Sequence, residues 1–382
     1  MKKILVLIVL FNVLYARAQQ SDQSYFEQHV IKVVMDYNAE IGKLGEALKL
    51  AKASNSADTI ALQGKRKETV YACFQVPQDF VVKNPASPFC IAALTMLGEG
   101  GDSSPVQLVD LERLFNSLAP ELRNNAEGRA YAAKLASLNW LNRIKKQLND
   151  ASVLKGISGN AVAEQLKEKI GKRIAVNPLG PASTFFDTDS ALMNKIKPSV
   201  LIVNMAYQKD NTLKVNTATA YVIAASGICV TNYHVMREYS RKGIYTSLSV
   251  TDPKGKVYPV TELLSCSESD DLAVFKVDTR GERFIALPLG EEAEKMRPVY
   301  VLGHPKQDFY QFTTGQVTEN YSSTLFGRPC KLMNITAEFN VGSSGGPIVD
   351  GYGNVVGTVS RRNDGNGMKM GIPVSELRKL IE

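Results

Sequence analysis

Three short stretches in the second half of the chain hold residue types that can carry out nucleophilic chemistry together. His234 directly follows one apolar run, Asp271 leads into another, and Ser344 lies in a glycine-rich stretch. An imidazole can take the proton of a hydroxyl, and a carboxylate beside the imidazole keeps it in the right tautomer. A carboxylate that enters an apolar strand also needs such a donor, because burial without a partner is costly. The three residue types therefore indicate acyl transfer with a serine nucleophile.

The glycines around the serine have a role of their own in this chemistry. In Gly342-Ser343-Ser344-Gly345-Gly346-Pro347 they let the backbone turn tightly and keep the Ser344 hydroxyl unobstructed. They also leave backbone N–H groups that can point at one place, and acyl transfer needs such donors for the oxyanion of its intermediate. Each stretch alone has a structural alternative: a strand-end histidine, a solvated aspartate in a turn, or a flexible loop. Their joint presence in one strand-rich region favours a shared site.

The elements that must position these residues change character near residue 185. Residues 19–180 hold apolar residues at mostly helical spacing, which predicts a small helical bundle. Residues 181–198 mix Pro, Gly, Ser and Asp, which is typical of a linker. In residues 199–382 short apolar runs alternate with turn residues, which predicts a domain of many short strands closed into a barrel or paired barrels.

The first 18 residues have the pattern of a secretory signal. Lys2 and Lys3 precede an apolar run, and Ala16-Arg17-Ala18 fits the rule for cleavage after small residues. The alternative is an uncleaved anchor, but the run is well short of the ~20 residues that span a bilayer. We therefore expect residues 1–18 to be a signal peptide and the mature protein to be exported, in the periplasm or secreted, with no membrane span after cleavage.

The composition excludes several classes of protein and site. The chain of 382 residues is 44% hydrophobic and 22% charged, which is ordinary for a globular protein. Its formal net charge is +7, without a dense basic tract interleaved with aromatic residues, so nucleic-acid binding is not expected. Its three histidines are scattered at positions 29, 234 and 304, so no metal site is expected.

Five cysteines occur, and none of them forms a CxxC pair. A zinc ribbon or a redox dithiol is therefore not expected. An exported chain can form disulfides, and Cys73 with Cys90 is the pair to test first. The alternative is that all five are small buried apolar residues.

Several stretches resemble a known family in the same order. They are ICVTNYHV, DDLAVFKV, VYVLGHP, TTGQVTEN and NVGSSGGPIVDGYGNVVGTVS. Residues 199–382 thereby resemble the chymotrypsin-type, or trypsin-like, serine proteases of the bacterial HtrA-like branch. The resemblance implies a double six-stranded β-barrel after the helical bundle, a polypeptide substrate and an exported serine endopeptidase that needs no cofactor. No stretch resembles the PDZ domain of typical members, so PDZ-gated activation is not expected.

The resemblance assigns roles residue by residue. Ser344 would be the nucleophile, His234 the general base and acid, and Asp271 the group that orients the imidazole. The backbone N–H groups of Gly342 and Ser344 would form the oxyanion hole. The strand at Val359, Ser360 and Arg361 would pair with the substrate backbone as an added β-strand. A departure from digestive trypsins is Ser343 in place of their aspartate, so activation through a newly cut N-terminus is not expected.

The resemblance also places three residues on the wall of the pocket for the side chain before the scissile bond: Glu338, Phe339 and Asn340. Phe339 would make a shallow apolar pocket, whereas Glu338, if it points inward, would attract Lys or Arg. His304 lies where the family usually has Asn, and we interpret it as structural because no carboxylate motif accompanies it.

Two other interpretations concern binding. The chain could be a catalytically silent or conditionally assembled protease-fold protein that serves as a peptide-binding scaffold. The helical domain could in addition dock a partner or drive self-association. Residues 84–135 resemble the helical region that precedes the thioredoxin-like domain in some bacterial envelope proteins, which implies a packing or docking module.

Overall fold

The computed structural model describes residues 20–98, 105–148, 156–209, 212–325, 328–362 and 367–381. The expected signal peptide, residues 1–18, lies outside these ranges. The chain divides into two compact units, Met1–Asn139 and Trp140–Glu382. None of the helices in the described ranges is long and apolar enough to cross a membrane.

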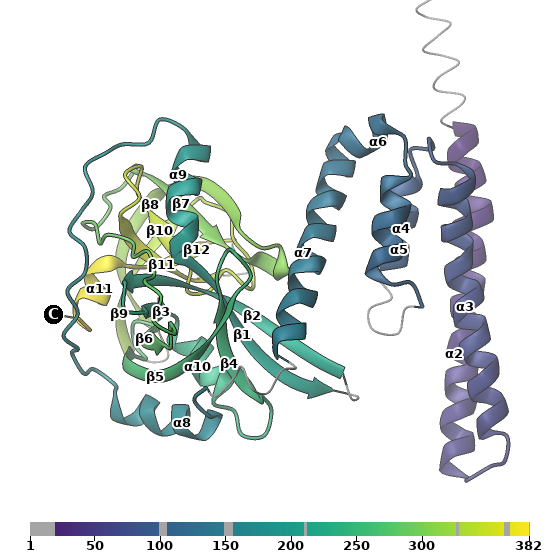
Figure 1. Ribbon diagram of the computed structural model, residues 1–382, viewed down its shortest axis with the longest axis horizontal. Helices are drawn as coiled ribbons and strands as arrows, with labels where there is room; N and C mark the ends of the chain where they lie inside the picture. The colour runs from purple at the N-terminus through teal and green to yellow at the C-terminus, as the bar shows by residue number, and fades with distance from the viewer. Residues whose placement is uncertain are drawn as a thin grey trace, which may run out of the picture. The chain divides into compact units, whose positions relative to one another are not determined.

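The first unit is helical, as the spacing of its apolar residues predicts (Figure 1). Phe80, Leu94, Leu97 and Leu114 are among the side chains that form its buried core. Its elements are η1 (Glu27–Ile31), α2 (Lys32–Ala53), α3 (Thr59–Lys83), α4 (Cys90–Gly98), α5 (Leu108–Asn116), α6 (Pro120–Asn124) and the first part of α7 (Ala126–Leu148).

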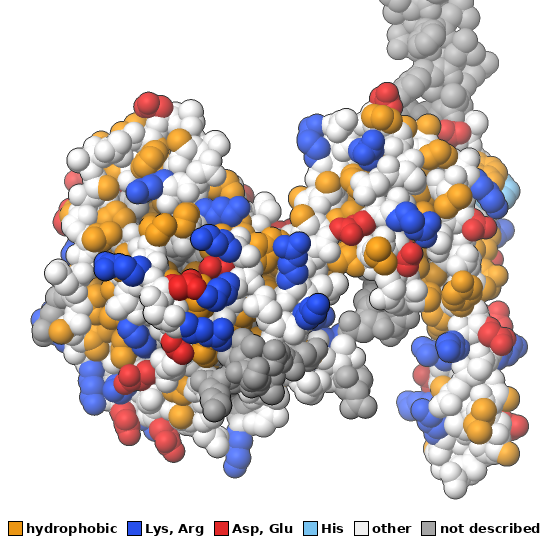
Figure 2. Space-filling view, viewed as in Figure 1, with side chains coloured by type: hydrophobic (Ala, Val, Ile, Leu, Met, Phe, Trp, Pro, Cys, Tyr) orange, Lys and Arg blue, Asp and Glu red, His pale blue; other side chains and the backbone are white. Residues whose placement is uncertain are grey.

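The long helices α2 and α3 form a hairpin with a narrow buried seam. Val34, Leu44 and Ala51 are the buried residues of α2. Other apolar side chains of the hairpin are exposed, with Leu50 at 70% and Ile60 at 80%. Figure 2 shows hydrophobic atoms on the surface of this region.

The second unit contains the first of two closed antiparallel barrels. Its strand order is β1-β2-β3-β6-β5-β4, and β1 closes it by pairing with β4. Strand β1 is continuously apolar because Leu201 and Val203 belong to one buried cluster while Val200 and Ile202 belong to another. The strands are β1 (Val200–Lys209), β2 (Thr212–Ala224), β3 (Ile228–Thr231), β4 (Ser247–Thr251), β5 (Val257–Ser267) and β6 (Leu272–Val277), with α10 (Tyr233–Tyr239) after β3.

The second barrel repeats this plan. Its strand order is β10-β11-β12-β9-β8-β7, and β10 closes it by pairing with β7. The prediction of a helical bundle followed by a chymotrypsin-like double six-stranded β-barrel is confirmed. The strands are β7 (Pro298–Gly303), β8 (Gln311–Leu325), β9 (Arg328–Ile335), β10 (Pro347–Val349), β11 (Val355–Arg362) and β12 (Lys369–Pro373), with η4 (Pro305–Gln307) after β7 and α11 (Val374–Arg378) at the end.

Residues 140–148 and 156–198 pack on the barrels, although the sequence pattern places them in the helical domain and the linker. They hold the end of α7, α8 (Gly159–Glu168), α9 (Asp189–Ile196) and η3 (Lys197–Ser199). Val162 of α8 and Ile196 of α9 are buried in the two barrel cores. The boundary between the compact units lies at 139/140. Apolar periodicity shows that a helix buries one face, but not which surface covers that face.

All five cysteines are free and buried: Cys73, Cys90, Cys229, Cys266 and Cys330. The suggested Cys73–Cys90 disulfide is not formed, and the alternative of small buried residues describes the structure. Burial raises the pKa of the Cys90 thiol to about 11 and that of Cys266 to about 12. These thiols are therefore neutral and unreactive in the folded protein.

Candidate active site

The first barrel brings His234 and Asp271 together through one strand pair. Strand β3 runs into α10, so His234 lies just past the strand end. Asp271 immediately precedes β6, which pairs with β3 in antiparallel register. The end of β3 therefore lies beside the start of β6. The side chain of Asn232 holds this junction by donating to the backbone O of Asp271 at 2.9 Å.

The contact between the imidazole and the carboxylate is direct. His234 Nδ1 lies 2.9 Å from Asp271 Oδ2 and 3.0 Å from Oδ1. The backbone N–H of His234 also donates to Oδ1 at 3.0 Å, and the Ser360 hydroxyl donates to Oδ2 at 2.6 Å. Asp271 is fully buried. A carboxylate held this way keeps the imidazole proton on Nδ1 and leaves Nε2 as the proton acceptor.

Ser344 comes from the second barrel, in the turn before β10. This turn requires glycine at two positions, because Gly342 has φ +102° and Gly345 has φ +81°. A Cβ on Gly342 would clash with the backbone O of His304, and one on Gly345 would clash with Thr231. The sequence pattern Gly-Ser-Ser-Gly-Gly is thus explained by the space available and by the backbone conformation.

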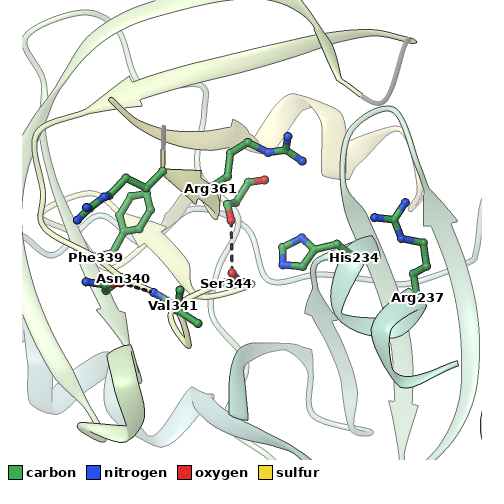
Figure 3. Close-up of a pocket in the computed structure, with 9 residues that line it drawn as sticks. His234, Arg237, Phe339, Asn340, Val341, Ser344 and Arg361 are labelled. Carbon is green, nitrogen blue, oxygen red and sulfur yellow. Dashed lines mark hydrogen bonds between the residues drawn. The ribbon is translucent and has the colours of Figure 1, made fainter. Parts of the chain in front are cut away.

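Two of the three predicted catalytic side chains, His234 and Ser344, line one cavity of about 520 Å³, and the buried Asp271 lies against His234. Figure 3 shows the imidazole beside Ser344. The Ser344 hydroxyl donates to the backbone O of Ser360 at 3.4 Å. Within the described residues, this contact takes the place of a hydrogen bond to His234. A rotation about χ1 between staggered positions would redirect the hydroxyl.

The backbone around Ser344 presents two unused donors. The N–H of Lys306 donates to Val341 O at 2.7 Å, and the Thr219 hydroxyl donates to Gly342 O at 2.8 Å. In a trans peptide the C=O and the N–H point to opposite sides, so the Gly342 N–H faces away from Lys306. Throughout the described ranges, the N–H groups of Gly342 and Ser344 donate to no other group. They are the two donors that the sequence assigns to an oxyanion hole.

Only some of the residues predicted to bind substrate line the cavity. Phe339, Asn340, Ser360 and Arg361 line the cavity, together with Arg237, Val341 and Arg362 (Figure 3). The side chain of Glu338 is 73% exposed and binds Lys369 at 2.5 Å, so it does not line the cavity. The apolar alternative at Phe339 is the one compatible with this geometry.

The backbone of Val359 does not have the role predicted for it, which was to pair with a substrate. Its backbone N–H donates to Gly346 O at 2.8 Å, and its C=O accepts from Gly345 N at 2.9 Å. Both backbone groups are therefore used to hold the nucleophile turn and are not available to pair with a substrate. Ser360 has a role that sequence reasoning missed, since its hydroxyl holds Asp271 and its carbonyl holds the Ser344 hydroxyl. Only the three-dimensional register of β11 reveals this double contact.

A second cavity of about 360 Å³ also borders the nucleophile and shares His234, Val341 and Ser344 with the first. Its further lining includes Met205, Asn216, Glu238, Lys306 and Gln307. No motif in the sequence indicates this wall, because its residues come from four separate segments. Two cavities that meet at Ser344 provide space for a chain on both sides of a scissile bond.

His304 is buried behind this second cavity. Its Nδ1 accepts a hydrogen bond from the backbone N–H of Tyr310 at 3.0 Å. Burial lowers the pKa of His304 to about 3, so the ring is neutral near pH 7. No group of three or more His, Cys, Asp or Glu side chains that could hold a metal ion occurs in the described ranges.

Comparison with known proteins agrees with this geometry. Residues 218–357 match the family model of the trypsin-like peptidase domain. Protease Do-like 1, chloroplastic, from Arabidopsis thaliana is 27% identical over 208 residues, covering 50% of this chain and 46% of that protein. Serine protease HTRA2, mitochondrial, from Bos taurus is 26% identical over 214 residues, covering 53% of this chain and 44% of that protein.

Among solved structures, the active form of the Rv3671c protease from M. tuberculosis is 22% identical with a TM-score of 0.42. That similarity covers 55% of this chain and 91% of the other. The chain spans about half the length of the curated relatives named above.

Proposed function

We propose that the chain is a serine endopeptidase that hydrolyses polypeptides, because residues 218–357 match the trypsin-like peptidase domain and the chain resembles the HtrA and Deg proteases. The observation that carries the proposal is the shared cavity, where the Asp271-bound imidazole of His234 stands beside Ser344. The chemistry needs no cofactor, since the nucleophile, the base and the oxyanion donors all belong to the chain.

The proposed reaction has two halves. Ser344 Oγ attacks the carbonyl carbon of the scissile peptide bond while His234 Nε2 takes the hydroxyl proton. The N–H groups of Gly342 and Ser344 stabilise the oxyanion, and one such donor contributes about 3 kcal/mol to the transition state. The imidazolium then protonates the leaving amine, and the C–N bond breaks to leave an acyl-enzyme. Water, deprotonated by His234, hydrolyses the acyl-enzyme in the second half.

We propose an apolar side chain for the residue before the scissile bond. The support is the cavity wall, where Phe339 contributes its ring and the carboxylate of Glu338 is turned outward to Lys369. Profiling with a peptide library tests this assignment. A preference for Lys or Arg at that position would contradict it.

The decisive test of the proposed function is covalent labelling by a fluorophosphonate probe. Labelling of the wild type and loss of labelling in Ser344→Ala would support an enzyme. The matched control is Ser240→Ala, an exposed serine bonded to its own helix, which should be labelled like the wild type. Absence of labelling in the wild type under all conditions would contradict the proposal.

A second candidate is a conditionally assembled protease-fold protein. The contact that favours it is the hydrogen bond from Ser344 Oγ to Ser360 O, which points the hydroxyl away from the base. On this proposal the probe labels only after a polypeptide is bound. Labelling at the same rate with and without a peptide would contradict it.

Export and docking are further proposals. The support for export is the signal pattern in residues 1–18, and N-terminal sequencing of the mature protein should find Gln19 first. The support for docking is the exposed apolar surface of the α2–α3 hairpin. Replacing Leu50 and Ile60 by Lys should abolish any partner binding or self-association in the full chain.

A further inference from the structure

We propose that Trp140, near the middle of α7, is a positioning residue for the oxyanion hole, acting through the turn of residues 304–310. This inference rests on the proposed function, because the oxyanion hole has a role only in acyl transfer. Trp140 touches neither cavity at the nucleophile. Its effect on Gly342 would therefore pass through the 304–310 turn alone.

The 304–310 turn has a backbone that needs outside support. Lys306, Gln307 and Tyr310 have φ values of 50°, 66° and 62°. Residues with a Cβ rarely adopt this left-handed region, and such conformations persist only where the surrounding contacts enforce them. The turn is thus a segment whose shape depends on its neighbours.

The turn in its present shape fixes the peptide that carries the oxyanion donor. The Lys306 N–H donates to Val341 O, which orients the peptide between Val341 and Gly342. The backbone O of His304 lies so close to Gly342 that a Cβ there would clash with it. If the turn shifted, the Gly342 N–H would lose its direction toward the cavity, and misplacing a catalytic group by about 1 Å can cost about a hundredfold in rate.

Tyr310 is the inner anchor of the turn. Its backbone N–H donates to His304 Nδ1, and its ring meets the His304 ring edge-on at 4.7 Å between centroids. Its buried hydroxyl has no hydrogen-bond partner among the described residues. Ring contacts therefore hold its side chain: Trp140 at 6.1 Å between centroids, and the Lys197 ammonium at 5.0 Å from the ring centroid.

Trp140 is itself fixed on the first barrel. Its ring lies against Gly255, where a Cβ would come within 3.2 Å of it. Gln147, two turns further along α7, donates to Gly255 O at 2.6 Å and accepts from Val257 N at 3.2 Å. The turn between β4 and β5 thus contacts α7 at both Trp140 and Gln147. Trp140 thereby forms one side of the packing around Tyr310.

The test compares three variants of the full chain. Trp140→Ala should lower kcat on a peptide substrate by about tenfold or more, with KM changed less than about twofold, because the ground state does not use the oxyanion hole. Trp140→Phe should restore most of kcat, since it keeps an aromatic ring against Tyr310. Leu148→Ala is the matched control, because it removes a buried side chain of the same helix two turns away. Equal kcat losses in Trp140→Ala and Leu148→Ala, or none in either, would overturn the inference.

A second measurement does not depend on activity. In the Ser344→Ala background, amide hydrogen exchange of residues 304–310 and 341–345 should be about tenfold faster with Trp140→Ala than without it, and unchanged with Leu148→Ala. Unchanged exchange in the Trp140 variant would overturn the inference even if the wild type cleaves peptides. Failure of fluorophosphonate labelling together with faster exchange would instead overturn the proposed function and leave the support of the turn by Trp140 standing.

Discussion

The two barrels prepare their catalytic groups to different degrees. In the first barrel, the Asp271 carboxylate accepts from the His234 ring, the His234 backbone and Ser360, all at 3.0 Å or less. In the second, the Ser344 hydroxyl makes one longer contact of 3.4 Å with Ser360 O. The base is therefore locked, whereas the nucleophile is one rotation from alignment. The group that must rotate to meet His234 therefore belongs to the second barrel.

The largest expected effect comes from removing the nucleophile. Ser344→Ala should lower kcat by about a millionfold, because no other group can form the acyl-enzyme. A residual rate of about a thousandfold over water should remain, since the oxyanion donors are intact. Single-turnover kinetics on an activated ester measures both. A smaller loss would mean that the second barrel does not supply the nucleophile.

Replacing Asp271, which holds the His234 ring, should lower kcat somewhat less than replacing Ser344. Asp271→Asn should lower kcat by about ten-thousandfold, because the amide cannot hold the proton on His234 Nδ1. The loss should not be rescued by occupying the cavity with longer peptides. Steady-state kinetics with a thermal melt as a folding control measures this. Retention of more than about a tenth of kcat in a folded variant would contradict the locked pair.

Ser360 contacts both Asp271 and Ser344, so its replacement affects the groups of both barrels. Ser360→Ala removes the 2.6 Å donor to Asp271, and a hydrogen bond to a charged group contributes about 1.5–3 kcal/mol. We expect kcat/KM to fall by about tenfold to hundredfold, with the acidic limb of its pH profile displaced. Ser360→Thr keeps a hydroxyl and should recover most of the loss. An unchanged pH profile in the alanine variant would show that Ser360 does not position the pair.

The smallest effect concerns stability behind the oxyanion turn. Burial lowers the pKa of His304 from 6.5 to about 3, so the unfolded chain binds a proton that the folded chain excludes. Stability should therefore fall as the pH drops below 6.5, by about 2 kcal/mol at pH 5. His304→Asn should remove this part of the pH dependence of the free energy of unfolding. Urea unfolding of both proteins at pH 7 and pH 5 measures this dependence. An equal loss of the free energy of unfolding at pH 5 in both proteins would contradict it.

The candidate residues could be found in the sequence because histidine is rare in this chain and each of the three stretches borders an apolar strand. The structure places His234 and Ser344 at one cavity and the buried Asp271 against His234. The direction of the pocket side chains could not be read, because Glu338 and Phe339 lie after the end of β9 in an irregular segment without a regular alternation of faces. Glu338 and Phe339 illustrate this, since one faces Lys369 and the other the cavity.

The sequence pattern places residues 140–180 in the helical domain, because apolar periodicity does not show which surface covers a helix. The apolar stripe of α8 predicts a buried face, and Val162 and Leu166 are indeed buried. What covers them is the first barrel, which is distant in sequence. The shape of the 304–310 turn could not be predicted from the sequence either. Its residues with left-handed φ values are not glycines, and the ring that packs against Tyr310 comes from α7.

The buried thiols offer a way to time the opening of each unit. Cys73 and Cys90 lie in the helical unit, and Cys229, Cys266 and Cys330 lie in the barrels. A thiol reagent reaches such side chains only when the surrounding structure opens. Pulse alkylation followed by peptide mass spectrometry would therefore report two separate opening rates from one sample, without any added label. Because all five thiols are free, no reduction step is needed before the alkylation.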